Sequence, residues 1–297
     1  MYTLSSKLKV FSIVLMLVGL LGIGYSFISA PKTTAEVEKI LEADAHGEHG
    51  NAHGATAHEA HRKDAKAEAE HQEHLVHVLH QLENKPWAAI YVAALFFMLI
   101  SLGVLAFYGI QNVAQAGWSP ILFRVMQGIT AYLPVGSVIF FVLLLLSAFH
   151  YNHLFVWMDH NLLDPANPKY DKLIANKSGY LNEYFWLIRA AIFLIGWNLY
   201  RYFSRKNCLA QDEASDNTFY KKNFKMSAAF LVFFIVTESI MSWDWIMSVD
   251  PHWFSTLFGW YVFASFFVSG ITVIALVTLY LKSKGYLEHV NTSHIHD

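Results

Sequence analysis

The stretch from Met226 to Ser255 reads "MSAAFLVFFIVTESIMSWDWIMSVDPHWFS" and decides how the rest of the chain is interpreted. Its first half is apolar enough to lie in lipid, yet its second half carries Glu238, Asp244 and Asp250 among tryptophans. A carboxylate inside a bilayer costs about 2.5–3.5 kcal/mol on insertion scales, so such residues are rare and usually functional. The stretch therefore predicts a membrane helix that carries acids for a purpose.

The composition places the whole chain in a membrane. Of its 297 residues, 55% are hydrophobic, 16% are aromatic and only 15% are charged. The formal net charge of −2 gives no basic footprint for nucleic acid, and no nucleic-acid partner is expected. The single cysteine, Cys208, excludes an intrachain disulfide, a CxxC redox pair and a cysteine-ligated iron–sulfur cluster.

Six segments reach the length of about 20 apolar residues that a bilayer core requires. They are residues 8–29, 87–112, 130–154, 184–204, 225–247 and 255–281. The predicted fold is an all-α, polytopic transmembrane helix bundle. The first segment is longer than the apolar core of a cleavable signal peptide, so we interpret it as a retained helix.

The order of these segments predicts five regions. They are an N-terminal transmembrane helix at 1–30, a His-rich extracytoplasmic segment at 31–86, a four-helix bundle at 87–250, a sixth helix at 251–282 that begins a second bundle, and a cytoplasmic tail at 283–297. Lysine and arginine cluster at 201–225 and flank the first and last helices, so the positive-inside rule places both ends of the chain in the cytoplasm.

The segment 46–80 contains nine of the sixteen histidines. Its Ala, Gly, Glu and Lys content cannot build a core, which predicts an exposed segment that becomes helical from about Ala65 to Leu82. Metal buffering stays open as an alternative, but no closed ligand set can be picked out, and we assign no metal site. Seven of the nine tryptophans fall near the outer helix ends, where interfacial belts alone would explain most of them.

Depth distinguishes the acids of the 225–247 helix. Glu238 lies about 13 Å below the outer end of that helix, close to the bilayer centre, whereas Asp244 lies within one turn of the surface and is rotated by about 120° from Glu238. These positions favour a proton relay, with Glu238 as its deepest carrier. Asp250, which precedes a proline, is more typical of a turn.

Three further side chains belong to the candidate site. His150 and His153 are i,i+3 neighbours if the third helix runs to 154, with His160 on roughly the same face. Arg189 lies about 8 Å below the outer surface and needs a partner, for which Glu238 and Asp244 are the candidates. The ion pair between Arg189 and its carboxylate either locks two helices together or serves the relay. The two histidines are either functional or merely exposed at the membrane interface.

The run "SWDWIMSVDPHWFSTLFGWYVFASFFVSG" (242–270), together with "FHYNHLFVW" (149–157), resembles the NrfD/polysulfide-reductase-type membrane subunits. Within that family it is most similar to the ActF-type subunit of alternative complex III, the bacterial quinol:electron-acceptor oxidoreductase. The resemblance covers approximately residues 87–282. It implies a family of about ten helices in two four-helix bundles, of which this sequence supplies six.

The resemblance also implies cofactors and partners. These are a second NrfD-like membrane subunit, an iron–sulfur subunit and cytochrome c subunits with haem c in the bacterial cytoplasmic (inner) membrane, whereas this chain binds no redox cofactor itself. His150, His153 and Asp244 match the family's positions for quinone, expected as menaquinol, and Glu238 matches a buried relay carboxylate. The ActF type is the copy without a proven quinol site, which favours a scaffold and proton-relay role.

Two other classes of function compete with this one. A secondary transporter or channel would show inverted repeats with broken helices at matching positions, whereas Pro134 and Gly136 interrupt the third segment without a corresponding break in a second half. A bis-histidine haem b protein needs two histidines that face each other across the bundle, whereas His150 and His153 share one predicted helix and the remaining histidines lie in loops.

Overall fold

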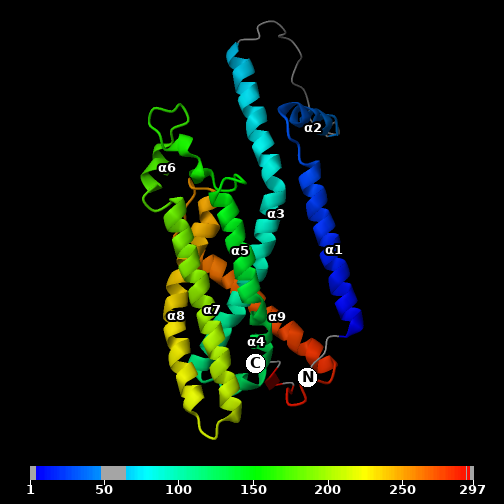
Figure 1. The fold of residues 1–297 in the computed structure, drawn as a ribbon, viewed down its shortest axis with the longest axis vertical. Helices are drawn as coiled ribbons and strands as arrows, with labels where there is room; N and C mark the ends of the chain where they lie inside the picture. The colour runs from blue at the N-terminus through cyan, green and yellow to red at the C-terminus, as the bar shows by residue number, and fades with distance from the viewer. Residues whose placement is uncertain (1–4, 48–64, 292, 295–297) are drawn as a thin grey trace. The chain divides into compact units, whose positions relative to one another are not determined.

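The computed structural model describes residues 5–47, 65–291 and 293–294, and every regular element among them is a helix (Figure 1). The chain divides into two compact units, Met1–Ile90 and Tyr91–Asp297. The long helix α3 (Ala65–Ala114) begins in the first unit and continues into the second. The all-helical class predicted from the sequence is therefore confirmed for the described residues.

The first unit contains α1 (Ser6–Ser29), α2 (Thr34–Gly47) and the beginning of α3. No residue of α1 is buried, as expected for an apolar helix whose surroundings are lipid rather than protein. The helix α2 was not predicted. Its signal is the capping-box pattern Thr33-x-x-Glu36. Thr33 Oγ1 accepts from the Glu36 amide at 3.3 Å, and the Glu36 carboxylate accepts at 2.8 Å from the amide of Lys32, one residue before the cap.

The His-rich segment is described only in part. The beginning of α3 at Ala65 agrees with the helix predicted from about that residue. Leu75, in this part of α3, is buried with 2% of its surface exposed. Residues 48–64, with the histidines at 49, 53, 58 and 61, lie outside the described residues.

The second unit is a helix bundle. After α3 its elements are η1 (Ser119–Leu122), α4 (Phe123–Ile129), η2 (Thr130–Tyr132), α5 (Leu133–Ala148), η3 (Val156–Met158), η4 (His160–Leu162), α6 (Lys172–Lys177), α7 (Glu183–Glu213), α8 (Thr218–Trp245), η5 (Met247–Val249) and α9 (Phe258–Ser283). The helix α7 packs against α5 and α8, and α8 packs against α9 (Figure 1). The turn 214–217 makes α7 and α8 an antiparallel hairpin.

Five helical stretches of the described residues are long and apolar enough to cross a membrane, which makes the chain a multi-pass membrane protein. They are Ser6–Ser29, His74–Ala114, Ser119–Ala148, Thr218–Val249 and Phe258–Ser283. The fourth predicted span, 184–204, does form part of the 31-residue helix α7, but it is absent from this group. The polar second half of α7, "NLYRYFSRKNCLAQDE" at 198–213, explains its lower hydropathy.

The predicted end of the third apolar segment at residue 154 is wrong, because α5 ends at Ala148. The backbone turns at His150, whose φ of 59° is left-handed, and two amides fold back onto the last turn of the helix. The buried Asn152 side chain then accepts from the Ser147 hydroxyl at 3.0 Å and from the Leu154 amide at 3.3 Å. His150 and His153 consequently do not share a helix face.

The interfacial interpretation of the tryptophans is wrong for three of the seven. Trp157, Trp186 and Trp245 are at most 2% exposed and lie inside the bundle. The segment after α5 folds back so that Phe155 packs edge-on against Trp186 at 4.9 Å. Tyr91 donates to the Trp245 carbonyl at 2.9 Å, which satisfies an acceptor near the end of α8. By contrast, Trp253 and Trp260 are exposed, as an interfacial position requires.

Candidate functional site: a buried ion pair, a buried acid and an adjoining pocket

The centre of the candidate site is an ion pair between Arg189 on α7 and Asp244 on α8. Arg189 Nε donates to Asp244 Oδ2 at 2.6 Å, and Arg189 Nη2 donates to Oδ1 at 2.9 Å. The two side chains are only 8% and 0% exposed. This two-pronged geometry is the strongest that an arginine makes with a carboxylate. Of the two partners left open by the sequence, Arg189 has Asp244.

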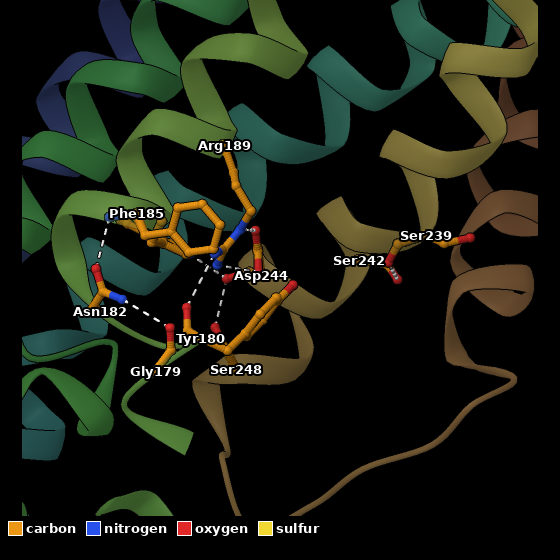
Figure 2. A network of polar contacts seen from close by, with 10 residues as sticks. Gly179, Tyr180, Asn182, Phe185, Arg189, Ser239, Ser242, Asp244 and Ser248 are labelled. Carbon is orange, nitrogen blue, oxygen red and sulfur yellow. Dashed lines mark hydrogen bonds and ion pairs between the residues drawn. The ribbon is translucent and has the colours of Figure 1, made fainter. Parts of the chain in front are cut away.

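The surroundings of the pair satisfy its remaining polar atoms. Arg189 Nη1 donates to the Tyr180 carbonyl at 3.1 Å, and the guanidinium lies 4.1 Å from the Tyr180 ring centroid and 4.4 Å from that of Phe185 (Figure 2). The Asp244 backbone carbonyl accepts from Trp186 Nε1 at 2.8 Å and from the Ser248 hydroxyl at 2.6 Å. Both charges are therefore neutralised and held in one geometry, which fastens α7 to α8.

The Tyr180 hydroxyl is an uncharged group at this site. Burial and, after it, the negative charge of Asp244 raise the pKa of Tyr180 well above its ordinary value. Tyr180 therefore remains a neutral phenol at physiological pH, able to donate or accept a hydrogen bond.

Glu238 is buried separately from the ion pair. The residue is 5% exposed, its Oε2 accepts from the neighbouring Ser239 hydroxyl at 3.2 Å, and its Oε1 has no hydrogen-bond partner among the described residues. Ser239 and Ser242 lie on α8 apart from the Arg189–Asp244 pair (Figure 2). A carboxyl oxygen unsatisfied by protein groups inside a bundle costs free energy unless water or a ligand supplies a partner, which makes Glu238 a candidate functional acid.

The buried face of α8 carries further polar groups toward its other end. Asn223 donates to the Tyr108 hydroxyl at 2.9 Å, and Ser227 shares a hydrogen bond of 2.7 Å with Tyr200. Between Ser227 and Glu238 the buried positions are the aromatic residues Phe230 and Phe234, followed by Thr237. Polar neighbours of Glu238 on α8 therefore lie mainly toward the Asp244 end.

A pocket of about 490 Å³ adjoins the ion pair. Its lining is largely apolar and comes from α6, the turn before α7, the end of α8, η5 and the segment after η5. The lining residues are Leu173, Asn176, Lys177, Tyr180, Leu181, Trp243, Met247, Ser248, Pro251, Trp253 and Phe254. Trp243 Nε1 is buried and has no partner among the described residues. An apolar cavity with few convergent polar groups is typical of a small-molecule site.

The helix α6 is fastened over this pocket by polar contacts to the 250–252 turn. Asp171 Oδ1 caps α6 by accepting from the Leu173 and Ile174 amides at 2.8 and 3.1 Å, while its Oδ2 lies 2.6 Å from His252 Nε2. Lys177 Nζ donates to the Pro251 carbonyl. The predicted turn at Asp250 is confirmed, because its Oδ1 accepts from the His252 amide at 3.2 Å.

These contacts predict an acid-sensitive attachment of α6. The Ile174 amide and then His252 lower the pKa of Asp171, so its contribution is complete above the ordinary aspartate pKa of about 3.9 and is lost as the pH falls through the lowered value. Asparagine keeps the capping oxygen but not the charge. We expect the thermal midpoint of Asp171→Asn to change less between pH 6 and pH 3 than that of the parent; superimposable profiles would contradict this assignment.

The sequence-predicted histidines lie elsewhere. His150 Nε2 is 3.4 Å from Glu183 Oε1, and His150 is also in ring contact with His160; His153 is exposed on the same segment. Neither His150 nor His153 lines the 490 Å³ pocket. The structure thus brings Arg189 and Asp244 together, buries Glu238 on the same helix as Asp244, and separates both histidines from the pocket.

The residues that surround the ion pair and the pocket were not predicted from the sequence. Tyr180, Lys177 and Trp243 come from a loop, a short helix and an apparent interfacial tryptophan, none of which carries a periodic signal. One signal was available for α6, since Asp171 followed by a short apolar run is an N-cap pattern.

The chain was also compared with known proteins. No family model matches the sequence, and no curated protein matches it.

Proposed function

We propose that this chain is the membrane subunit of a respiratory quinol:electron-acceptor oxidoreductase of the alternative complex III type, and that it conducts protons through Glu238. It carries no redox centre of its own in this proposal. An iron–sulfur subunit and cytochrome c subunits supply the electron path, and a second NrfD-like subunit supplies the quinol-oxidising site. The support from sequence is the resemblance of residues 242–270 to that family.

The observation that carries the proposal is the state of Glu238. A carboxyl group that is 5% exposed, with one oxygen unpartnered among the described residues, sits inside the apolar span Thr218–Val249. A structural acid would be expected to have its oxygens satisfied, as Asp244 has. An acid that exchanges protons must instead be open to a transient donor or acceptor, such as a water molecule.

Quinol oxidation supplies the reason for a proton carrier. Each quinol that gives up its electrons also releases protons, so acids or bases are required along the route by which those protons leave. Glu238 is the carrier in this scheme. Asp244 is not a carrier in this scheme, because both of its oxygens accept hydrogen bonds from Arg189. The Arg189–Asp244 pair instead holds α7 against α8 and so keeps the surroundings of Glu238 fixed.

In this proposal the 490 Å³ pocket holds a quinol ring that this chain does not itself oxidise, and it takes the place of His150 and His153, which do not line it. Trp243 Nε1 and the Tyr180 hydroxyl are the groups suited to a ring oxygen, and Trp253 and Phe254 supply an apolar wall. The pocket lies at the end of the bundle that the positive-inside rule assigns to the outer side. In this topology α7 crosses as well and brings the number of crossings to six, both chain ends are cytoplasmic and the membrane is the bacterial inner membrane.

The test is a Glu238→Gln variant in the assembled complex. Glutamine keeps the size and the hydrogen bond to Ser239 but cannot bind and release a proton. We expect at least about a tenfold loss in quinol:acceptor turnover or in protons released per electron, because removing a positioned acid–base group typically costs 10²–10⁴-fold. Turnover is followed with a soluble quinol, and proton release with a pH-sensitive dye in proteoliposomes.

The matched control is Glu213→Gln, which makes the same change at an exposed position at the end of α7 and should leave both readouts unchanged. Normal turnover and proton yield in an assembled Glu238→Gln complex would refute the relay. Copurification without iron–sulfur and haem c subunits would refute the complex. Solute flux by the isolated chain in proteoliposomes would favour a transporter, and a Soret band on the isolated chain would favour haem b.

A further inference from the structure

Three side chains with metal-binding chemistry meet at one end of the bundle. His150 follows α5, His160 is the first residue of η4, and Glu183 is the first residue of α7. Their ligand atoms all lie within 4.8 Å of one another. His150 Nε2 is 3.4 Å from Glu183 Oε1, and the two imidazole rings are 5.9 Å apart at 72°. Three separate elements are thus required to build the cluster.

The backbone at His150 is an independent sign that its side chain matters. The Tyr151 amide donates to the Leu146 carbonyl and the His150 amide to the Ser147 carbonyl, both at 3.0 Å, which is the Schellman pattern of a helix end. His150 occupies its left-handed position at φ 59°, where glycine is the usual residue. A histidine here costs backbone strain that the helix end itself does not need.

Glu183 is the second sign. Its Oε1 is buried but has no hydrogen-bond partner among the described residues, although the side chain as a whole is 20% exposed. The 3.4 Å approach of His150 Nε2 does not meet hydrogen-bond geometry. A cation coordinated by this oxygen would remove the deficit, and solvent can deliver it, because the His150 side chain is 49% exposed.

We propose that His150, His160 and Glu183 form a binding site for a divalent transition-metal ion of the Zn²⁺ type. Two imidazoles and one carboxylate are a zinc ligand set that leaves a fourth position for water. Ligand atoms around a tetrahedral ion with bonds of about 2.0 Å lie about 3.3 Å apart. The His150–Glu183 separation already matches this value, and the widest pair needs to close by about 1.5 Å, which rotation of the exposed His160 side chain provides.

The site is independent of the proposed proton relay and of the His-rich segment. Its ligands are spread over the sequence from 150 to 183 without a recognised metal-ligand spacing, so the sequence alone does not indicate a metal site there. The nine histidines of 46–80 would also bind zinc and obscure the measurement. The experiment therefore uses the full chain in detergent with those nine histidines replaced by asparagine as the parent.

The decisive variant is His150→Gly. Glycine is favoured at this left-handed position, so the change removes a ligand without harming the helix end. We expect the parent to bind one Zn²⁺ per chain in a calorimetric titration, with a thermal midpoint that zinc raises. Loss of an outer-sphere partner typically lowers metal affinity about 10–100-fold. Because His150→Gly removes a direct ligand, we expect it to lower zinc affinity by more than that. Its midpoint without zinc should equal or exceed that of the parent.

Two further variants complete the test. Glu183→Gln should also abolish zinc binding, whereas His153→Ala removes a neighbouring histidine outside the cluster and should leave both stoichiometry and affinity unchanged. Mg²⁺ should produce no shift in the midpoint, because imidazole does not suit it. The proposal is overturned if the parent binds no zinc, or if His150→Gly and Glu183→Gln bind it as the parent does.

Discussion

Replacing Asp244 by alanine is expected to lower the free energy of unfolding by about 3–5 kcal/mol, because it leaves the Arg189 guanidinium buried without a counter-charge. Arg189 cannot escape by deprotonation or by reaching water, since it stays protonated and its side chain is 8% exposed between Tyr180 and Phe185. Unfolding by sodium dodecyl sulfate in mixed micelles, followed by tryptophan fluorescence, measures the change.

Two companion variants separate charge from shape. Asp244→Asn preserves the volume and one acceptor, and we expect it to be destabilising by a similar amount because the buried guanidinium still loses its counter-charge. The double variant Arg189→Met with Asp244→Leu removes both charges and should recover most of the loss, since apolar replacement of a buried pair is often neutral or better. A double variant no more stable than Asp244→Ala would show that the geometry of the pair, rather than its charge balance, holds α7 to α8.

The sequence predicted that Arg189 is paired but left its partner open, and the hairpin geometry shows why. Reflected about the 214–217 turn, Arg189 is level with about residue 242 on α8. Glu238 and Asp244 therefore both lie within about 6 Å of it along the axis at 1.5 Å per residue. Which of the two carboxylates faces Arg189 depends on the rotation of α8 about its axis. That rotation is set by the packing of the helices, which the periodicity of one sequence does not determine.

The helices themselves were largely predictable, because long apolar runs mark them directly. The ends were less so, as α5 shows. Phe149, Tyr151 and Leu154 lengthen the apolar run and so extend the predicted helix to residue 154. The helix ends earlier because His150 adopts a left-handed backbone conformation and the buried Asn152 side chain accepts from Ser147. The i,i+3 relation assumed for His150 and His153 depended on that incorrect end. Contact between His150 and His160 arises instead from a chain reversal.

The remaining differences have the same origin in tertiary contacts. Trp157, Trp186 and Trp245 resemble interfacial tryptophans in the sequence, but all three are core residues. The segment after α5 packs Phe155 and Trp157 against Trp186, and Trp245 lies against Phe140, Phe193 and Trp197 of the neighbouring helices. The pocket beside the ion pair is formed by α6 and the 250–254 segment, which are joined mainly by single polar contacts such as Asp171 to His252. Such pairings between short, irregular segments leave no pattern in the sequence.

The second large effect is expected at Gly103, where α3 and α9 cross at very short range. A Cβ added at Gly103 would lie 2.6 Å from the Phe266 carbonyl oxygen and 3.0 Å from its ring, and one added at Gly270 would lie 3.0 Å from the Val104 amide nitrogen. Small residues at such crossings let membrane helices approach closely, and the close approach supplies the packing energy. The two backbones must therefore separate if either glycine gains a side chain.

We expect Gly103→Ala to cost about 1–3 kcal/mol and Gly103→Val to cost more, because the obstacle is a backbone carbonyl of α9, which no rotamer change can move. The matched control is Gly128→Ala in α4, where an added Cβ meets nothing within 4 Å. That change should be neutral or stabilise by up to about 1 kcal/mol, since alanine is the better helix former. Unfolding in mixed micelles compares the two. Equal effects at Gly103 and Gly128 would mean that α3 and α9 are not in backbone contact.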